Sequence, residues 1–212
     1  MSVVRRHARR LRGIAVACVL GIGFWQLGQA AYIPAKAWLA QELMLKAWDR
    51  AGAGIERPVP WPWADTWPVA RLLAQGGKID LIVLAGGSGR TLAFGPGHLG
   101  ASAEPGARGN SVIAGHRDTH FRFLKDVAIG EALWIEGADG TRYRYRIIDL
   151  DIVDARRSSV LLDTDDALLS LITCYPFDAD EPGGPLRYVV TARLEAAVTT
   201  QAELSSASTP RL

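Results

Sequence analysis

The run YRYRIIDLDIV, Tyr143 to Val153, decides the fold class of this chain. Aromatic and β-branched side chains dominate it, and such residues favour a pleated strand over a helix. Directly before it, Ala138-Asp139-Gly140 lies between two apolar runs, and Asp-Gly is a strong signal for a β-hairpin turn. The sequence therefore predicts a long hairpin within a domain built mainly from strands.

Around this hairpin, short apolar runs separated by Gly, Pro and Asp clusters fill residues 69 to 195. The predicted strands are Ile79–Leu84, Ser111–Ala114, Ala132–Glu136, Thr141–Val153, Ala167–Thr173 and Arg187–Leu194. Short helices are predicted at Val69–Gln75 and Phe121–Leu124. Many short strands favour a β-barrel or a β-sandwich. Residues 196–212, rich in Ser, Thr and Ala, form a tail that we expect to be disordered.

The N-terminus carries a membrane signal. Residues 13–33 include no charged side chain and are long enough for one transmembrane helix. The basic segment 1–12 precedes them, and positive charge favours the cytoplasmic side, so the rest of the chain is expected to be exported. We prefer an uncleaved signal-anchor. A cleaved signal peptide with a site near Gly28-Gln29-Ala30 is the alternative.

Residues 34–68 are predicted to connect the anchor to the domain. Ala35–Arg50 is rich in helix formers, and its apolar stripe, which includes Trp38 and Trp48, packs either on the domain or at the membrane interface. Repeated prolines make Gly52–Pro68 extended, and its tryptophans are expected to dock on the domain.

Charge and cysteine content narrow the function classes. Without the five arginines in the first twelve positions, 19 of the 24 basic residues remain against 22 acidic ones. The domain is therefore mildly acidic, which argues against nucleic-acid binding. The two cysteines, Cys18 and Cys174, lie in very different contexts, so a disulfide is not expected.

Three segments place a reactive side chain at the end of a predicted strand. NSVIAGHRDTHF delivers His116, SLITCYPF delivers Cys174, and GGPLRYVV delivers Arg187. A cysteine nucleophile needs a thiolate, which a nearby imidazole or guanidinium favours. Acyl transfer also needs a proton donor for the leaving amine and a donor to the developing oxyanion, which His and Arg supply.

These segments resemble the sortase family. AGHRDTHF looks like the segment of its catalytic histidine, and SLITCYPF resembles its TLxTC signature, with Ser170 in place of the first Thr. Arg187 follows Cys174 at the family's spacing. The Trp-rich WPWADTWPVARL, together with the anchor, resembles the marine proteobacterial subgroup of Gram-negative sortases.

The resemblance implies a closed β-barrel of about eight strands with short helices, and a membrane-anchored cysteine transpeptidase. Cys174 would form an acyl-enzyme thioester with an LPxTG-like motif of a secreted protein, His116 would move protons, and Arg187 would stabilise the oxyanion. An amine of unknown identity would accept the acyl group. Thr173, His120 and Asp118 are expected to bind substrate or shape the site. The domain would lie on the periplasmic side of the inner membrane.

The loops Asp154–Asp166 and Asp178–Gly184 are expected to border the substrate groove. For the acidic residues Asp163, Asp165 and Asp166 we favour a solvated loop over a calcium site. No cofactor and no metal are expected.

Other functions stay open or are set aside. An inactive peptide-binding module and a thiol hydrolase that resolves the thioester with water remain alternatives. His116 and His120 are four residues apart, but Arg117 stands where a zinc protease needs a glutamate. A zinc protease is therefore set aside.

Overall fold

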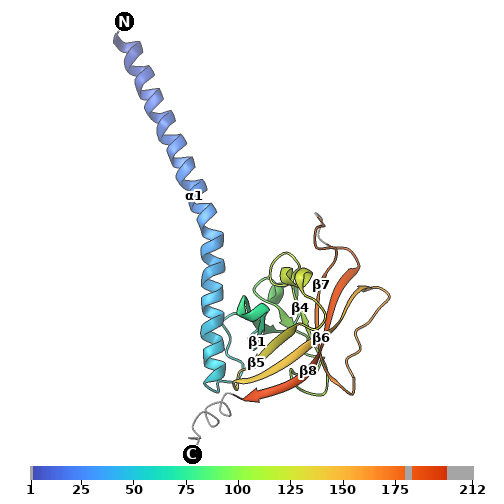
Figure 1. The fold of residues 1–212 in the computed structure, drawn as a ribbon. Coiled ribbons are helices and arrows are strands. Elements are labelled where there is room, and N and C mark those ends of the chain that lie inside the picture. Colours follow the sequence, from blue (N-terminus) through green and yellow to red (C-terminus); the bar gives the residue numbers. More distant parts are fainter. Residues whose placement is uncertain (1, 180–182, 200–212) are drawn as a thin grey trace, which may run out of the picture. The chain divides into compact units, whose positions relative to one another are not determined.

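The structure, a computed structural model, describes residues 2–179 and 183–199. Within them, eight strands close into a barrel in the order β1-β2-β3-β4-β7-β8-β6-β5 (Figure 1). The strands are β1 (Pro68–Ala74), β2 (Ile79–Ala85), β3 (Gly97–His98), β4 (Gly109–Ala114), β5 (Ala132–Gly137), β6 (Thr141–Asp154), β7 (Ala167–Cys174) and β8 (Leu186–Thr199). The helices are α1 (Ser2–Gly52), α2 (Gly89–Leu92), and two 3₁₀ turns, η1 (Gln75–Gly77) and η2 (Arg122–Asp126). The mainly-β prediction and the eight-stranded barrel are confirmed.

The barrel combines antiparallel pairs with two parallel ones. β2 runs parallel to β3, and β4 runs parallel to β7, whereas the other neighbouring pairs are antiparallel. The predicted hairpin joins β5 to β6, where Gly140 adopts φ 78°, a conformation that glycine tolerates best. The parallel pair β4–β7 sends both strands to the same edge of the barrel, which is where the site lies.

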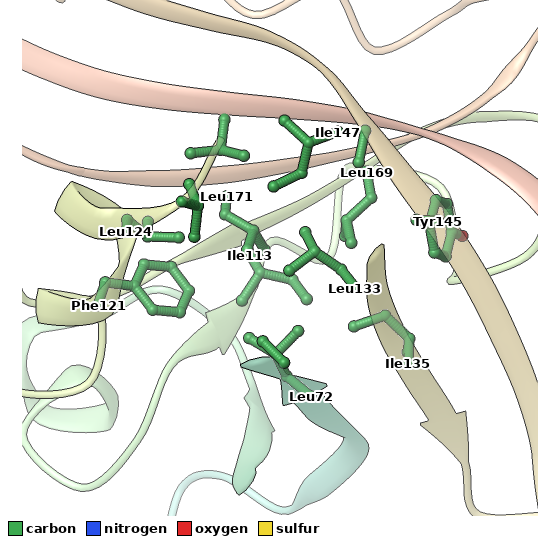
Figure 2. Close-up of a cluster of buried hydrophobic side chains, with 14 of the residues drawn as sticks. Leu72, Ile113, Phe121, Leu124, Leu133, Ile135, Tyr145, Ile147, Leu169 and Leu171 are labelled. Atoms are coloured by element: carbon green, nitrogen blue, oxygen red, sulfur yellow. The ribbon is translucent and has the colours of Figure 1, made fainter. Parts of the chain in front are cut away.

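Inward-facing aliphatic side chains fill the barrel. Leu133 and Ile135 of β5 alternate with outward residues, as do Leu169 and Leu171 of β7. Figure 2 shows these side chains meeting Ile113 of β4 in one cluster. Burying each contributes about 1.5–3 kcal/mol, so the cluster holds the strands in fixed register. The ends of β4, β7 and β8 are therefore rigid supports.

The predicted helix at Val69–Gln75 is wrong. That segment forms β1, in which Pro68, Ala70, Leu72 and Ala74 are buried and the residues between them are partly exposed. Pairing with β2 on one side and β5 on the other fixes the extended conformation. A seven-residue run is too short for periodicity to separate the two structures, and long-range pairing decides.

The predicted disordered tail is wrong for its first residues. β8 continues to Thr199, which pairs with Thr141 at the start of β6. Residues 200–212 lie outside the described residues. The two-residue β3 was also not predicted, because it is defined only by its partners β2 and β4.

The N-terminal segment is one helix. α1 covers the predicted span and continues through Pro34 into the predicted helix at Ala35–Arg50. Its stretch Val16–Gly52 is long and apolar enough, by length and composition, to cross a membrane. Residues 1–42 and 43–212 form two separate compact units.

The second unit begins earlier than the predicted domain start at Val69. Met44 and Trp48 of α1 are buried against Ile82 and Leu84 of β2. In this unit the apolar stripe packs on the barrel through Trp48, which agrees with the first of the two alternatives.

The three tryptophans after α1 differ in their contacts with the barrel and in their exposure. Trp61 packs on Phe94 with ring centroids 4.9 Å apart. The backbone of Trp67 accepts a hydrogen bond from Ala85 N at 2.8 Å, and its ring lies under the Arg57 guanidinium. Trp63 is 82% exposed, so the docking predicted for it is wrong.

Candidate active site

The parallel pair β4–β7 brings the predicted histidine to the predicted cysteine. Ala114 is the partner of Ile172 in this ladder, and Gly115 N donates to Ile172 O at 3.0 Å. Continuing the register by two residues sets His116 beside Cys174, on chain segments that neighbour each other at about the 4.8 Å spacing of strands.

The antiparallel pair β7–β8 adds the arginine. Cys174 and Arg187 are direct partners at the end of that ladder. Because β4, β7 and β8 are consecutive in the barrel, the register of the two pairs places the three residues in a row with the cysteine in the middle. The three side-chain types that acyl transfer needs therefore meet at one edge of the barrel.

The three residues of this row differ in their exposure to solvent. Cys174 and Arg187 are half-buried, and His116 is exposed. The Arg187 guanidinium donates through Nη1 to Gly184 O and Leu186 O, each at 2.8 Å. These bonds orient the guanidinium over the turn that leads into β8.

Thr173 ties β7 to the histidine segment. Its buried hydroxyl donates to Gly115 O at 2.8 Å, one residue before His116. This bond lies between the core and the row of reactive side chains. Thr173 therefore supports the site from the barrel side rather than pointing toward a substrate groove.

His120 lies in a hollow of about 420 Å³ between its own segment and β2, where Ile79 and Leu81 line the wall. Burial lowers the pKa of His120, and the nearby His116 lowers it further. The ring is therefore held toward its neutral form, in which one nitrogen accepts hydrogen bonds.

Arg117 was not identified as a site residue from the sequence. Only 6% of it is exposed, and its guanidinium donates to Pro176 O at 2.6 Å, to Ala179 O at 2.7 Å and to the Asp118 carboxylate at 3.1 Å. Asp118 thus pairs with Arg117. The only local signal was a charged residue three positions after the end of a predicted strand.

Three aromatic rings next to Cys174 were also not identified. Tyr175 stacks on Tyr188 with centroids 6.3 Å apart, and Phe177 meets Tyr188 edge-on at 5.2 Å. Tyr188 is the ladder partner of Thr173. Burial raises the pKa of Tyr188, and Tyr175 adds to this effect. Tyr188 and Phe177 also pack against the buried core of the barrel, so this cluster ties the segment after Cys174 to the core.

The acidic loop before β7 is held by arginines. Asp165 forms an ion pair with Arg108, and Asp166 pairs with Arg193 at 3.1 Å. Within residues 2–179 and 183–199, no group of three or more His, Cys, Asp or Glu side chains is arranged to hold a metal ion. Ion pairing agrees with the solvated-loop interpretation. Of the other predicted groove loop, residues 180–182 lie outside the described residues.

Comparison with known proteins bears directly on this arrangement. The Sortase domain family matches residues 74–195. This chain belongs to the sortase family. The match covers His116, Cys174 and Arg187 of this sortase and ends within β8.

Individual proteins to which this chain is similar are also sortases. Sortase D of Bacillus subtilis (strain 168) is 33% identical over 112 residues, which are 52% of this chain and 56% of that protein, so the match spans little more than half of the relative. The catalytic domain of SrtD from B. anthracis is 30% identical, with a TM-score of 0.53 over 63% of this sortase and 90% of that chain. Sortase C-3 of Streptococcus pneumoniae, 23% identical, has the same fold, with a TM-score of 0.57 over 81% and 88%.

Proposed function

We propose that this sortase is a membrane-anchored cysteine transpeptidase that cleaves an LPxTG-like sorting motif in a secreted protein and transfers the acyl part to an amine. Sortases are cysteine transpeptidases that act on secreted proteins with sorting motifs. The observation that carries the proposal is the row of His116, Cys174 and Arg187 across neighbouring strands.

Each member of the row has one task in the proposed reaction. The Cys174 thiolate attacks the carbonyl carbon of the motif threonine, and Arg187 stabilises the oxyanion that forms. His116 then gives a proton to the departing glycine amine as the threonine–glycine bond breaks, leaving a thioester on Cys174. An incoming amine attacks the thioester and loses a proton to His116, and the Cys174 thiolate leaves, which restores the starting state.

The N-terminal helix supports the proposed location. Residues 16–33 of α1, which include no charged side chain, suit a single membrane span, and the arginines in residues 1–12 favour a cytoplasmic N-terminus. The barrel would then face the periplasm of a Gram-negative cell. The WPWADTWPVARL segment supports membership of the marine proteobacterial subgroup.

Two other outcomes use the same fold. Water in place of the amine would make the protein a thiol hydrolase. A barrel that binds the motif without reacting would make it a peptide-binding module. The presence of all three reactive side chains in one row favours chemistry over binding alone.

Intact-mass spectrometry tests the proposal. The full chain is solubilised in detergent with Cys18→Ser, so that Cys174 is its only thiol, and is incubated with a library of LPxTG-like peptides. We expect an acyl adduct that disappears when triglycine is added and yields a ligated peptide. The matched variant Cys174→Ala should give no adduct.

Other results would redirect the assignment. An adduct that only water resolves would support the hydrolase. No adduct from any peptide, with Cys174 still alkylated by iodoacetamide and the fold intact, would support the binding module.

A further inference from the structure

We propose that Arg117 is a positioning residue that fixes the segment after Cys174 against the segment that carries His116. The inference rests on the proposed function but concerns a residue to which the reaction itself assigns no task. A buried guanidinium is costly unless its donors are paired, and Arg117 is 6% exposed between two exposed neighbours, His116 and Asp118.

The partners of Arg117 identify what it holds. Two of its nitrogens donate to backbone oxygens of the loop that begins after Cys174, Nη1 to Pro176 O at 2.6 Å and Nη2 to Ala179 O at 2.7 Å. Its Nε donates to the Asp118 carboxylate at 3.1 Å, which orients the guanidinium plane. The forked geometry reaches two carbonyls at once, which a lysine ammonium on one stem does not reproduce.

The reactive pair therefore lies between two cross-links. On the barrel side, the Thr173 hydroxyl donates to Gly115 O at 2.8 Å. On the loop side, Arg117, which directly follows His116, donates to the backbone of Pro176 and Ala179, the second and fifth residues after Cys174. With both cross-links in place, the segment that carries His116 and the segment that carries Cys174 are held against each other on two sides.

This arrangement has a consequence for rate rather than for affinity. Proton transfer from His116 to the leaving amine depends on its position relative to Cys174, and a displacement of about 1 Å can cost roughly 100-fold in rate. Alkylation of Cys174 by a small reagent needs only an accessible thiol. A positioning residue should therefore affect acylation by the peptide far more than alkylation.

The test compares Arg117→Gln with Arg122→Gln in the full-length chain in detergent, on the Cys18→Ser background. Arg122 is exposed and belongs to the same segment, and together with Arg117 it lines a second hollow, of about 310 Å³, that also touches Phe177 and Asp178. It therefore controls for the loss of one positive charge there. Activity is measured with an LPxTG-like peptide and triglycine, and amide hydrogen exchange is followed in the peptide covering Tyr175–Ala179.

For Arg117→Gln we expect kcat to fall roughly 100-fold with KM changed less than about threefold, and exchange in Tyr175–Ala179 to rise about tenfold or more. Iodoacetamide should alkylate Cys174 within about threefold of the wild-type rate. Arg122→Gln should match wild type in all of these. Unchanged kcat and unchanged exchange in Arg117→Gln would overturn the inference.

Arg117→Lys separates geometry from charge. Because one ammonium cannot serve both carbonyls, we expect Arg117→Lys to remain close to Arg117→Gln in kcat and exchange. Full recovery by lysine would overturn the inference, since charge alone would then suffice. If Arg117→Gln does not fold, Arg117→Lys decides by the same two readouts.

The two proposals fail separately. A wild-type protein that forms no acyl adduct contradicts the proposed transpeptidase, while the exchange measurement still decides the role of Arg117.

Discussion

The two ends of the β4–β7 pair are held in different ways. At the carboxyl end, the contacts are buried and aimed at backbone oxygens, from Arg117 and from Thr173. At the amino end, hydrogen bonds from Asn110 reach the backbone of the loop before β7, and two exposed ion pairs, Arg108 with Asp165 and Arg193 with Asp166, add to them. Buried hydrogen bonds fix geometry, whereas exposed ion pairs contribute little. The buried contacts from Arg117 and Thr173 thus lie at the end where the reactive atoms must align.

The largest effect should come from the nucleophile at the carboxyl end. Cys174→Ala removes the only atom that can form the thioester, so activity should fall by at least roughly 10⁴-fold. The half-buried position tolerates a smaller side chain, so thermal unfolding should shift by only a few degrees. Residual turnover above one part in a thousand, measured by ligated-product formation, would argue for another nucleophile.

Next comes the arginine on β8. Arg187→Ala should lower kcat by about 10²–10³-fold, as expected for the loss of one oxyanion donor. Arg193→Ala, on the same strand but at the amino end of β7, removes an exposed pair with Asp166 and should change kcat less than about threefold. An equal loss of kcat in Arg187→Ala and Arg193→Ala would contradict the proposed difference between the carboxyl and amino ends of the β4–β7 pair.

Thr173→Val tests the barrel-side cross-link. The change keeps the shape but removes the buried hydroxyl bond to Gly115 O, so we expect a loss of about 1–3 kcal/mol in the free energy of unfolding. Activity should fall roughly tenfold through misplacement of His116. Thr164→Val, whose exposed hydroxyl donates to Asp166 O, is the matched control and should lose under about 1 kcal/mol in denaturant titration.

At the amino end, Asp165→Asn should be nearly silent. The Arg108–Asp165 pair has side chains 73% and 92% exposed, so its removal should cost less than about 1 kcal/mol. Raising the salt concentration in wild type should have a similarly small effect, since salt screens exposed pairs. A loss above about 2 kcal/mol in urea unfolding would show that this end is held more firmly than its exposure implies.

The smallest effect concerns pH. Because burial lowers the pKa of His120 below its ordinary 6.5, the unfolded chain binds more protons than the folded one as pH falls below 6.5. Stability should therefore decrease on acidification through this window. The decrease should be shallower in His120→Gln, measured by urea unfolding between pH 7.5 and about 5.5. Identical slopes would show that His120 does not titrate differently on folding.

Sequence reasoning predicted most of the barrel because its strands are long enough to show alternation and β-branched richness. It failed at β1, where seven residues fit two periodicities and only pairing with β2 and β5 decides. It failed at β3, which has two residues and no pattern of its own.

At the site, the residue types and their places at strand ends predicted His116, Cys174 and Arg187, and strand register brings them into one row. Arg117 could not be predicted, because its acceptors lie 59 and 62 residues away and nothing local shows that the guanidinium turns inward. The local sequence pattern thus predicts which side chains lie at the ends of strands. It does not predict which side chains make the long-range hydrogen bonds that hold those strand ends in place.

The ladder partnership of Cys174 and Arg187 has a consequence for engineering. Since pairing of β7 with β8 sets their relation, the connection between them need not have one particular length. Closing a longer loop costs only about 0.6 kcal/mol for each doubling. Foreign segments inserted into this connection after Ala179, which Arg117 binds, are thus a route to new recognition sequences that keeps the pairing of Cys174 with Arg187.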